Sequence, residues 1–323
     1  MPNEQRMVCY DHDLHIEAYR LQGIVQKFSN HFHDYYVVGF VESGARRLWC
    51  KGKTYDLTAG DLILFSPRDN HYCTPVNGEP LDYRAVNIPA DVMQRAAKEV
   101  TGREDMPYFS RPVVRQGDCV HALRALYAAI QDGAPALEKQ EMFFYLLEQL
   151  LSDYAVPFAQ ADLPEQSGQI RALCTYMEQH YADNITLDEL VSRTDCGESY
   201  LLRLFAKQVG VSPYRYLQNI RLGQAKKLLE AGVPPVDAAG LTGFSDQSHF
   251  THYFKDFIGL TPGHYQRIFT GNPTDKEREQ WTDKQKNARW CWTKGCRRDL
   301  PPIRRASSAL HWANTFQRRS GRT

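Results

Sequence analysis

The spacing of apolar positions along the chain changes twice, and each region predicts a different kind of structure. Between about residues 24 and 90, short runs rich in β-branched and aromatic residues alternate with turn compositions such as ESGA, TAGD and PRDN. Short strands at near-regular spacing are typical of a small antiparallel barrel or sandwich. The runs expected to form strands are YYVVGFVE, RRLWCKG, KTYDL and DLILFSP.

Apolar residues then recur three and four positions apart over residues 119–130 and 137–154. That period predicts two amphipathic helices, joined by the turn sequence DGAP as a hairpin. Two uses of the hairpin's apolar stripe stay open. It can contact a second copy of the chain in a dimer, or it can pack against the barrel of its own chain.

The stretch VPFAQADLPEQSG holds two prolines and has little periodicity, so we expect the domain boundary there. A length of 323 residues also favours two domains with separate cores. The expected division is an N-terminal domain over 1–160, a linker over 161–169, an all-helical domain over 170–269 and a tail over 270–323. The tail is polar and basic and forms no apolar face, so we expect it to be mostly disordered.

The helical region contains the same pattern twice. FKDFIGLTPGHY at residues 254–265 repeats FAKQVGVSPYRY at 205–216 without a gap. Each copy predicts a short helix, a tight turn with glycine and a second helix, which is a helix-turn-helix. The second helices are expected at 199–209 and 246–258. Packing needs alone could produce two such helices, but the match over at least seven positions argues for a duplicated unit.

Capping residues mark where these helices begin. Thr186, followed three residues later by Glu189, predicts an N-cap with a capping-box pattern, and Ser245 is the expected cap of the second copy's long helix. Ser212-Pro213 and Thr261-Pro262 each combine an N-cap hydroxyl with a proline at the first helical position.

The helix that begins at Pro213 is expected to run about 19 residues, to Ala231, and to span nearly 30 Å. Major-groove segments on one face of B-DNA lie about 34 Å apart. One rigid helix of this length can therefore hold two reading helices one turn of DNA apart within a single chain.

Residues 168–268 resemble the DNA-binding domain of the AraC/XylS family of bacterial transcription regulators. The sequence GFSDQSHFTHYFKDFIGLTPGHYQR is very similar to that family's signature. The resemblance implies seven helices, two of which enter successive major grooves. It implies a regulator of transcription that binds promoter DNA, with a homodimer and RNA polymerase as expected partners. The polar start of the chain predicts a cytoplasmic location. Whether the output is activation or repression stays open.

Position-by-position transfer from the family assigns DNA-reading residues to the second helix of each helix-turn-helix. In the first copy Arg203 is the strongest candidate, because a guanidinium can bond guanine O6 and N7 together. Contact with phosphate alone is the alternative. In the second copy Gln247 could pair with adenine, and His252 stands where many relatives carry arginine. The full expected set is Ser199, Leu202, Arg203, Gln247, Ser248, His249 and His252.

Other residues of these helices have ordinary roles. Five apolar side chains are expected in the core: Leu201, Leu204, Phe205, Phe250 and Phe254. Five basic side chains could contact phosphate or lie solvated on the surface: Lys207, Arg221, Lys226, Lys227 and Lys255.

The N-terminal strands resemble the cupin-type barrel that members of this family often use to sense an effector. The residues expected to line or rim a small-molecule cavity are His31, His33, Tyr35, Trp49, His71 and Tyr72. Pockets that combine apolar walls with a few polar anchors are usual for small molecules. Any one of these histidines could equally be a hydrogen-bonded core or surface residue.

The alternative function is a metal-dependent cupin enzyme with an accessory helical domain. Three imidazoles, from His31, His33 and His71, could in principle hold Zn or Fe. Valines, Val37 and Val38, stand where metal-using cupins place a glutamate. We therefore expect no metal, no cofactor and no catalysis.

The net charge of +1 conceals a gradient along the chain. Residues 168–268 hold ten basic and ten acidic side chains, whereas residues 269–323 hold 13 basic and five acidic ones. DNA binding must therefore come from local geometry.

The start of the chain is too polar for a signal peptide, and no apolar run reaches the roughly 20 residues of a membrane helix. The eight cysteines are scattered, and we expect reduced thiols and no membrane partner.

Overall fold

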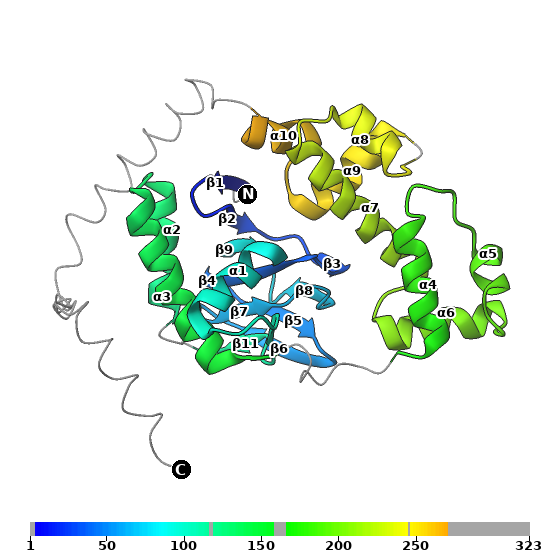
Figure 1. Ribbon diagram of the computed structural model, residues 1–323, viewed down its shortest axis with the longest axis horizontal. Coiled ribbons are helices and arrows are strands. Elements are labelled where there is room, and N and C mark those ends of the chain that lie inside the picture. The colour runs from blue at the N-terminus through cyan, green and yellow to red at the C-terminus, as the bar shows by residue number, and fades with distance from the viewer. Residues whose placement is uncertain (1–3, 116–118, 158–165, 245, 271–323) are drawn as a thin grey trace, which may run out of the picture. The chain divides into compact units, whose positions relative to one another are not determined.

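The computed structural model describes residues 4–115, 119–157, 166–244 and 246–270 (Figure 1). The N-terminal half holds two main antiparallel sheets. The six-stranded sheet has the order β1-β2-β9-β4-β7-β11, and the four-stranded sheet has the order β3-β8-β5-β6. These strands are β1 (Gln5–Asp11), β2 (Ile16–Ile24), β3 (Phe28–His31), β4 (Tyr35–Ser43), β5 (Arg46–Cys50), β6 (Lys53–Leu57), β7 (Leu62–Phe65), β8 (His71–Pro75), β9 (Leu81–Pro89) and β11 (Val113–Val114).

The central strand β4 is buried on both faces, because successive side chains of a strand point to opposite sides. Val38 and Phe40 join the core beneath the helices, whereas Val37 and Val41 join a second core between the two sheets. The sequence YYVVGFVE is apolar on both faces for this reason. A short two-stranded sheet of β10 (Pro107–Phe109) and β12 (Ala155–Pro157) completes the domain.

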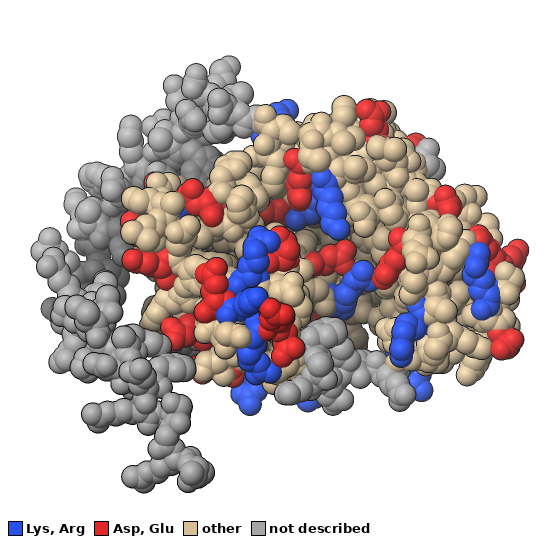
Figure 2. All heavy atoms as spheres, viewed as in Figure 1, with Lys and Arg blue, Asp and Glu red and all other residues tan. Residues whose placement is uncertain are grey.

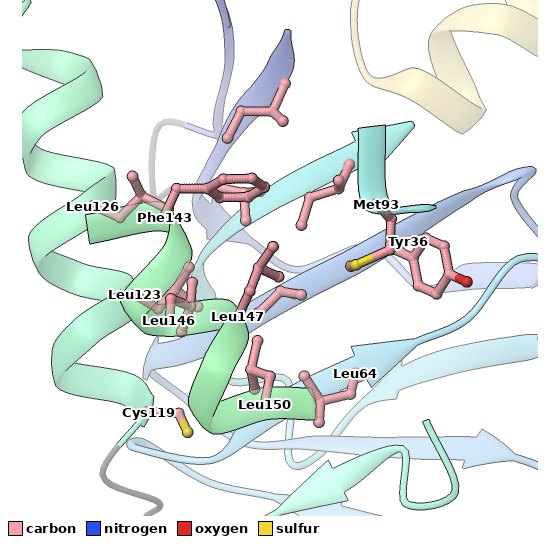
Figure 3. Packing of buried hydrophobic residues seen from close by; sticks show 14 of the residues in the cluster. Tyr36, Leu64, Met93, Cys119, Leu123, Leu126, Phe143, Leu146, Leu147 and Leu150 are labelled. Carbon is pink, nitrogen blue, oxygen red and sulfur yellow. The ribbon is translucent and has the colours of Figure 1, made fainter. Parts of the chain in front are cut away.

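Helices α1 (Ala90–Thr101), α2 (Cys119–Gln131) and α3 (Ala136–Tyr154) cover the outer face of the six-stranded sheet. The predicted hairpin is confirmed within a residue at each end. Figure 3 shows its apolar side chains, together with Met93 of α1, directed at the sheet residues Tyr36 and Leu64. The stripe is therefore buried against its own chain, which is the second of the two uses left open.

The fold class predicted from the sequence is confirmed, although several elements were missed. The four predicted strand runs form β4, β5, β6 and β7. The sequence patterns missed α1 and also β1 and β2, which lie almost entirely before the region expected to form strands. No predicted run corresponds to the remaining strands, of which β9 is the longest. Strand β1 is half-buried at six of its seven positions, so its sequence does not alternate between apolar and polar residues.

The described part of the C-terminal region, residues 166–244 and 246–270, contains seven helices (Figure 1). They are α4 (Gly168–Gln179), α5 (Leu187–Ser192), α6 (Glu198–Val209), α7 (Pro213–Glu230), α8 (Pro235–Leu241), α9 (Gln247–Ile258) and α10 (Pro262–Thr270). Helices α5 and α6 form the first helix-turn-helix, and α8 and α9 form the second. The predicted tail over 270–323 lies almost wholly outside the described residues.

The long helix α7 belongs to both units. Its first half contributes Leu217 and Ile220 to the core around α4, α5 and α6. Its second half contributes Ala225 and Leu229 to the core around α8, α9 and α10. Because one uninterrupted helix of about 27 Å enters two cores, it fixes the spacing of α6 and α9.

Matched signals end and begin helices in the two copies. Gly210 and Gly259 follow α6 and α9 with φ of 85° and 90°, a left-handed conformation that glycine adopts without steric cost. Ser212 caps α7 and Thr186 caps α5, as predicted. The prediction for α9 was wrong by one residue: the carboxylate of Asp246 accepts the N–H of His249 at 2.7 Å. Ser245 itself lies outside the described residues.

Candidate effector cavity and DNA-reading helices

A cavity of about 140 Å³ lies between the two sheets. Its walls are mainly apolar and come from both sheets, for example Leu48 and Leu57 from the smaller sheet and Ile63 and Leu81 from the larger. An apolar cavity of about 150 Å³ can hold one benzene molecule. The cavity therefore has the size and character of a site for a small organic ligand.

Three histidines gather at one end of the cavity. The nitrogens of His31, His33 and His71 that could act as ligands all lie within 4.8 Å of one another. His31 Nδ1 is 2.5 Å from the carbonyl of Ser29, and His71 Nδ1 is 2.9 Å from that of Asp69. A carbonyl only accepts, so these two Nδ1 atoms carry the protons, and each Nε2 keeps its lone pair.

The neighbours of the histidines are aromatic. The ring of His33 stacks on Tyr35 with centroids 4.7 Å apart, and His71 stacks on Phe65 at 3.9 Å. Phe257, near the end of α9, lies 4.6 Å from the ring of His31. Phe257 and Ile258 both line the cavity, so the second helix-turn-helix unit supplies part of its wall.

Burial keeps these imidazoles neutral. Desolvation lowers the pKa of His31 to about 4, although its backbone hydrogen bond opposes the shift. Desolvation also lowers the pKa of His33 and His71 well below 6.5, and the neighbouring histidines add to the effect. At neutral pH the cluster offers lone pairs and no positive charge.

Neutral imidazoles are the form of histidine that binds a metal ion. Nitrogens bound tetrahedrally at about 2.0–2.1 Å would lie about 3.4 Å apart, and the candidate nitrogens here all lie within 4.8 Å of one another. Val37 and Val38 bring no carboxylate to the cluster, and Val37 lines the cavity instead. Among the described residues, these three histidines form the group that could hold a metal ion.

Acid should destabilise the protein through these histidines. Below pH 6.5 histidines of the unfolded chain become protonated, whereas His31 in the folded protein stays neutral until the pH approaches its pKa of about 4. The free energy of unfolding therefore falls as the pH drops through this window. We expect His31→Asn to lessen the pH dependence by up to about 1.4 kcal/mol per pH unit. Urea unfolding between pH 4 and 7 measures it. His121→Asn, at an exposed position of α2, is the control for replacing a histidine outside the cluster.

The structure brings together four of the six predicted effector residues. His31, His33, Tyr35 and His71 line the cavity. Trp49 and Tyr72 do not line it: they lie opposite each other on β5 and β8 and stack at 5.4 Å. Because Leu48 and Cys50 face inward, strand alternation turns Trp49 to the outer face.

Sequence patterns missed several lining residues. Arg6, Tyr19 and Arg46 line the cavity, as does Phe257. Alternation could have found Arg46, since in RRLWC it shares a face with Leu48 and Cys50. Arg6 and Phe257 come from segments far apart along the chain, and no periodicity connects them.

On helix α6 the predicted reading residues face solvent. Ser199, Leu202 and Arg203 are exposed, while Leu201 and Phe205 are fully buried on the opposite face. An apolar Leu202 that stays 38% exposed is available to contact a thymine methyl group.

Helix α9 repeats this division with one difference. Gln247, Ser248 and His252 are exposed, and Phe250 and Phe254 are buried. His249 is half-buried. Its ring lies 6.0 Å from Phe244, so this side chain packs partly within its own unit. His252 Nε2 is 3.3 Å from a carboxylate oxygen of Asp256, in a highly exposed pair.

Two of the five basic residues considered for phosphate contact have structural roles. Arg221 is buried and donates to the carbonyls of Tyr181 and Asp183 at 2.7 and 2.8 Å. Lys226 is paired with Glu17 at 3.0 Å. Lys207, Lys227 and Lys255 are exposed. Figure 2 shows basic and acidic side chains interspersed on the face in view, which agrees with the balanced charge of the helical region.

Across the described residues, we find no helix that is both long and apolar enough to span a bilayer. Two helix-turn-helix units and a barrel with an internal cavity together define a ligand-responsive DNA-binding protein.

Comparison with known proteins gives the family. Residues 13–147 match the AraC-like ligand binding domain, and residues 190–268 match a helix-turn-helix domain. The chain is 48% identical over 249 residues to the uncharacterized HTH-type transcriptional regulator YbfI of Bacillus subtilis (strain 168), with 77% of this chain and 90% of YbfI covered. It is 26% identical over 248 residues to the HTH-type transcriptional activator RhaS of Escherichia coli (strain K12 / DH10B), covering 73% and 86%.

Among solved structures, ToxT from Vibrio cholerae O395 is similar with a TM-score of 0.48 and 16% identity, covering 80% of this chain and 98% of that one. The chain belongs to the AraC family of transcriptional regulators. It has an N-terminal ligand-binding domain and a C-terminal DNA-binding domain with helix-turn-helix units.

Proposed function

We propose that this regulator binds promoter DNA as a homodimer in the cytoplasm, with RNA polymerase as a further partner and without catalysis of its own. In each subunit α6 and α9 enter successive major grooves. The observation that carries this proposal is α7, one continuous helix embedded in the cores of both units. We place the functional boundary between the two domains within residues 161–169.

The reading residues in this proposal are Ser199, Leu202 and Arg203 on α6 and Gln247, Ser248 and His252 on α9, with His249 at the edge of the second set. All but His249 are exposed, and none is needed for the hydrophobic core. Selection of bound duplexes from a random pool, with and without candidate metabolites, tests sequence specificity. A full-length protein that protects no preferred sequence would refute the proposal.

Arg203→Ala tests direct readout. If Arg203 bonds a guanine, we expect a loss of about 1–3 kcal/mol on the selected site and relaxed preference at one position. Lys207→Ala, one turn further along the same helix and also exposed, is the matched control. Titration of both variants against selected and scrambled duplexes measures the difference. Equal weakening of Arg203→Ala on both duplexes would assign Arg203 to phosphate.

The effector in this proposal occupies the barrel cavity beside His31, His33, Tyr35 and His71. Phe257 supports a coupling between effector and DNA, because this residue of α9 lines the cavity. A ligand that binds more tightly when α9 is docked than when it is displaced shifts the equilibrium between the two arrangements. DNA affinity then changes by the same factor as ligand affinity.

The histidine cluster is the observation that would favour the alternative, a metal-dependent cupin enzyme. Metal analysis of the purified protein separates the two. Stoichiometric Fe, Mn or Zn that disappears in the double variant His31→Ala, His33→Ala would support the alternative. We expect no stoichiometric metal.

A further inference from the structure

Arg46 is the first residue of β5 and is fully buried, with 1% of its surface exposed. It lines the barrel cavity. Its Nη1 and Nη2 groups donate to the carbonyls of Val25 and Ile24, which closes the turn after β2. Its Nε has no hydrogen-bond partner, although this atom too is buried.

The positive charge of Arg46 is not neutralised. Among the described residues it forms no ion pair, since the two backbone carbonyls carry no net charge. Glu4 is close enough to exert an electrostatic influence, but it does not reach ion-pair distance. Buried charges in proteins are normally paired or coordinated. An unpaired buried guanidinium beside a cavity therefore indicates that the negative charge is supplied by a ligand in the cavity.

Arg6 brings a second guanidinium to the same cavity. It lies 5.7 Å above the ring of Phe28 and packs closely against Gly259, at the end of α9. It also forms no ion pair within the described part of the chain; Glu4 and Asp256 influence it only at longer range. Burial lowers the pKa of both arginines, as expected for charges removed from water without full compensation.

The remaining polar groups of the cavity are neutral. The hydroxyl of Tyr19 is buried, lines the cavity and has no hydrogen-bond partner. Burial raises its pKa well above 10, so it remains a donor. The histidines at the other end provide lone pairs and no charge. An anion would therefore be drawn to the arginine end.

The strand register separates these two ends. Cys50 of β5 pairs with His71, whereas Arg46 pairs with Pro75. Four residues of antiparallel strand correspond to roughly 14 Å. Apolar side chains, including Leu48, lie between the two ends. The cavity thus presents Arg46 at one end, an apolar middle and hydrogen-bond acceptors at the far end.

We propose that the cavity binds a small carboxylic acid with an apolar body, and that Arg46, assisted by Arg6, receives its carboxylate. A carboxylate fits better than a phosphate, because a carboxylate carries a single charge and the cavity of about 140 Å³ is mainly apolar. The proposal rests on the proposed effector site and specifies the chemical class of its ligand.

Matched acids and amides test the charge directly on the full-length protein. Benzoate and benzamide form one pair, and hexanoate and hexanamide the other; each pair differs by one charge at nearly constant shape. Calorimetric titration and thermal unfolding should show each acid binding at least about tenfold more tightly than its amide. Phenyl phosphate should bind more weakly than benzoate. Equal affinities within the pairs, or tighter binding of the phosphate, would overturn the proposal.

Arg46→Gln should reduce acid affinity about 10- to 100-fold and leave amide affinity within about threefold. Arg47→Gln is the matched control. Arg47 is the next residue of the strand, faces solvent and pairs with Asp56, so acid affinity should stay unchanged. Arg6→Gln should produce a smaller loss than Arg46→Gln. If Arg46→Gln does not fold, Arg6→Gln and the acid–amide comparison on the unaltered chain still test whether the cavity binds a carboxylate. Unchanged acid affinity in folded Arg46→Gln would overturn the proposal.

Failure here is distinguishable from failure of the proposed function. A neutral ligand that binds in the cavity and changes DNA affinity would refute the carboxylate and keep the effector site. Acid binding that depends on Arg46 but leaves DNA affinity unchanged would support the carboxylate and count against the effector role.

Discussion

Replacing Phe205 with alanine is expected to lower the free energy of unfolding by about 3–5 kcal/mol and to abolish specific DNA binding. Phe205 has no exposed surface, and its ring meets Tyr216 of α7 edge-on at 5.6 Å. Truncation leaves a cavity at the contact that holds α6 against α7. The exposed reading residues of α6 would then lose their fixed spacing from α9. Urea unfolding followed by circular dichroism, with DNA titration of the same sample, measures both effects.

The internal repeat supplies a paired test. Phe254 is the counterpart of Phe205 in the second unit, is also fully buried, and meets Tyr265 at 5.5 Å. We expect a similar loss for Phe254→Ala. Tyr200→Ala is the surface control on α6, because this side chain is 55% exposed and should change stability by less than about 0.5 kcal/mol. A loss below about 1 kcal/mol for Phe205→Ala would contradict the shared-core account of α7.

The duplicated helices were predictable because local signals agree with the tertiary structure. Helices α6 and α9 each have an apolar face and a glycine directly after the last turn, and the second copy repeats the first. Strand β4 was predictable for the same reason. By contrast, α1 belongs to no repeat, and two of its four buried residues are the small alanines Ala96 and Ala97.

The candidate site was only partly predictable. Histidines are rare enough to be noticed, and the structure gathers His31, His33 and His71. Arg46 reads as an ordinary surface residue until the strand's inward face is assigned, because arginine is usually exposed. Trp49 was expected to line or rim the cavity, but strand alternation places it on the outer face of the sheet. Residue type suggested the chemistry, but the pleat of the strand decided which side chains enter the cavity.

Contacts between distant segments lay beyond sequence patterns. Lys226 reads as a solvated lysine on the exposed side of α7. In the fold only 13% of its side chain is exposed, and its Nζ lies 3.0 Å from the carboxylate of Glu17 on β2. Glu17 also accepts from Asn87 at 3.2 Å and from the hydroxyl of Tyr265 on α10. One buried carboxylate therefore joins the barrel to two helices of the DNA-binding region.

Glu17→Gln is expected to cost about 3 kcal/mol of folding stability, because it leaves the Lys226 ammonium buried without its nearest counter-charge. Glu230, 3.6 Å from Lys226, retains part of the compensation, which places the effect at the lower end of the usual range. Urea unfolding measures the loss. Asp56→Asn is the control, since its pair with Arg47 is about 60% exposed and should contribute little to folding stability.

A double-mutant cycle with Lys226→Met separates the ion pair from the general cost of altering a buried site. Methionine removes the charge and keeps an apolar chain of similar length. The double variant should therefore lose about 1–3 kcal/mol less folding stability than the two single variants lose in sum. The same coupling should appear in DNA affinity, because Glu17 holds α7 and α10 against the barrel. Strictly additive losses would mean that the barrel and the DNA-binding region are not coupled through this carboxylate.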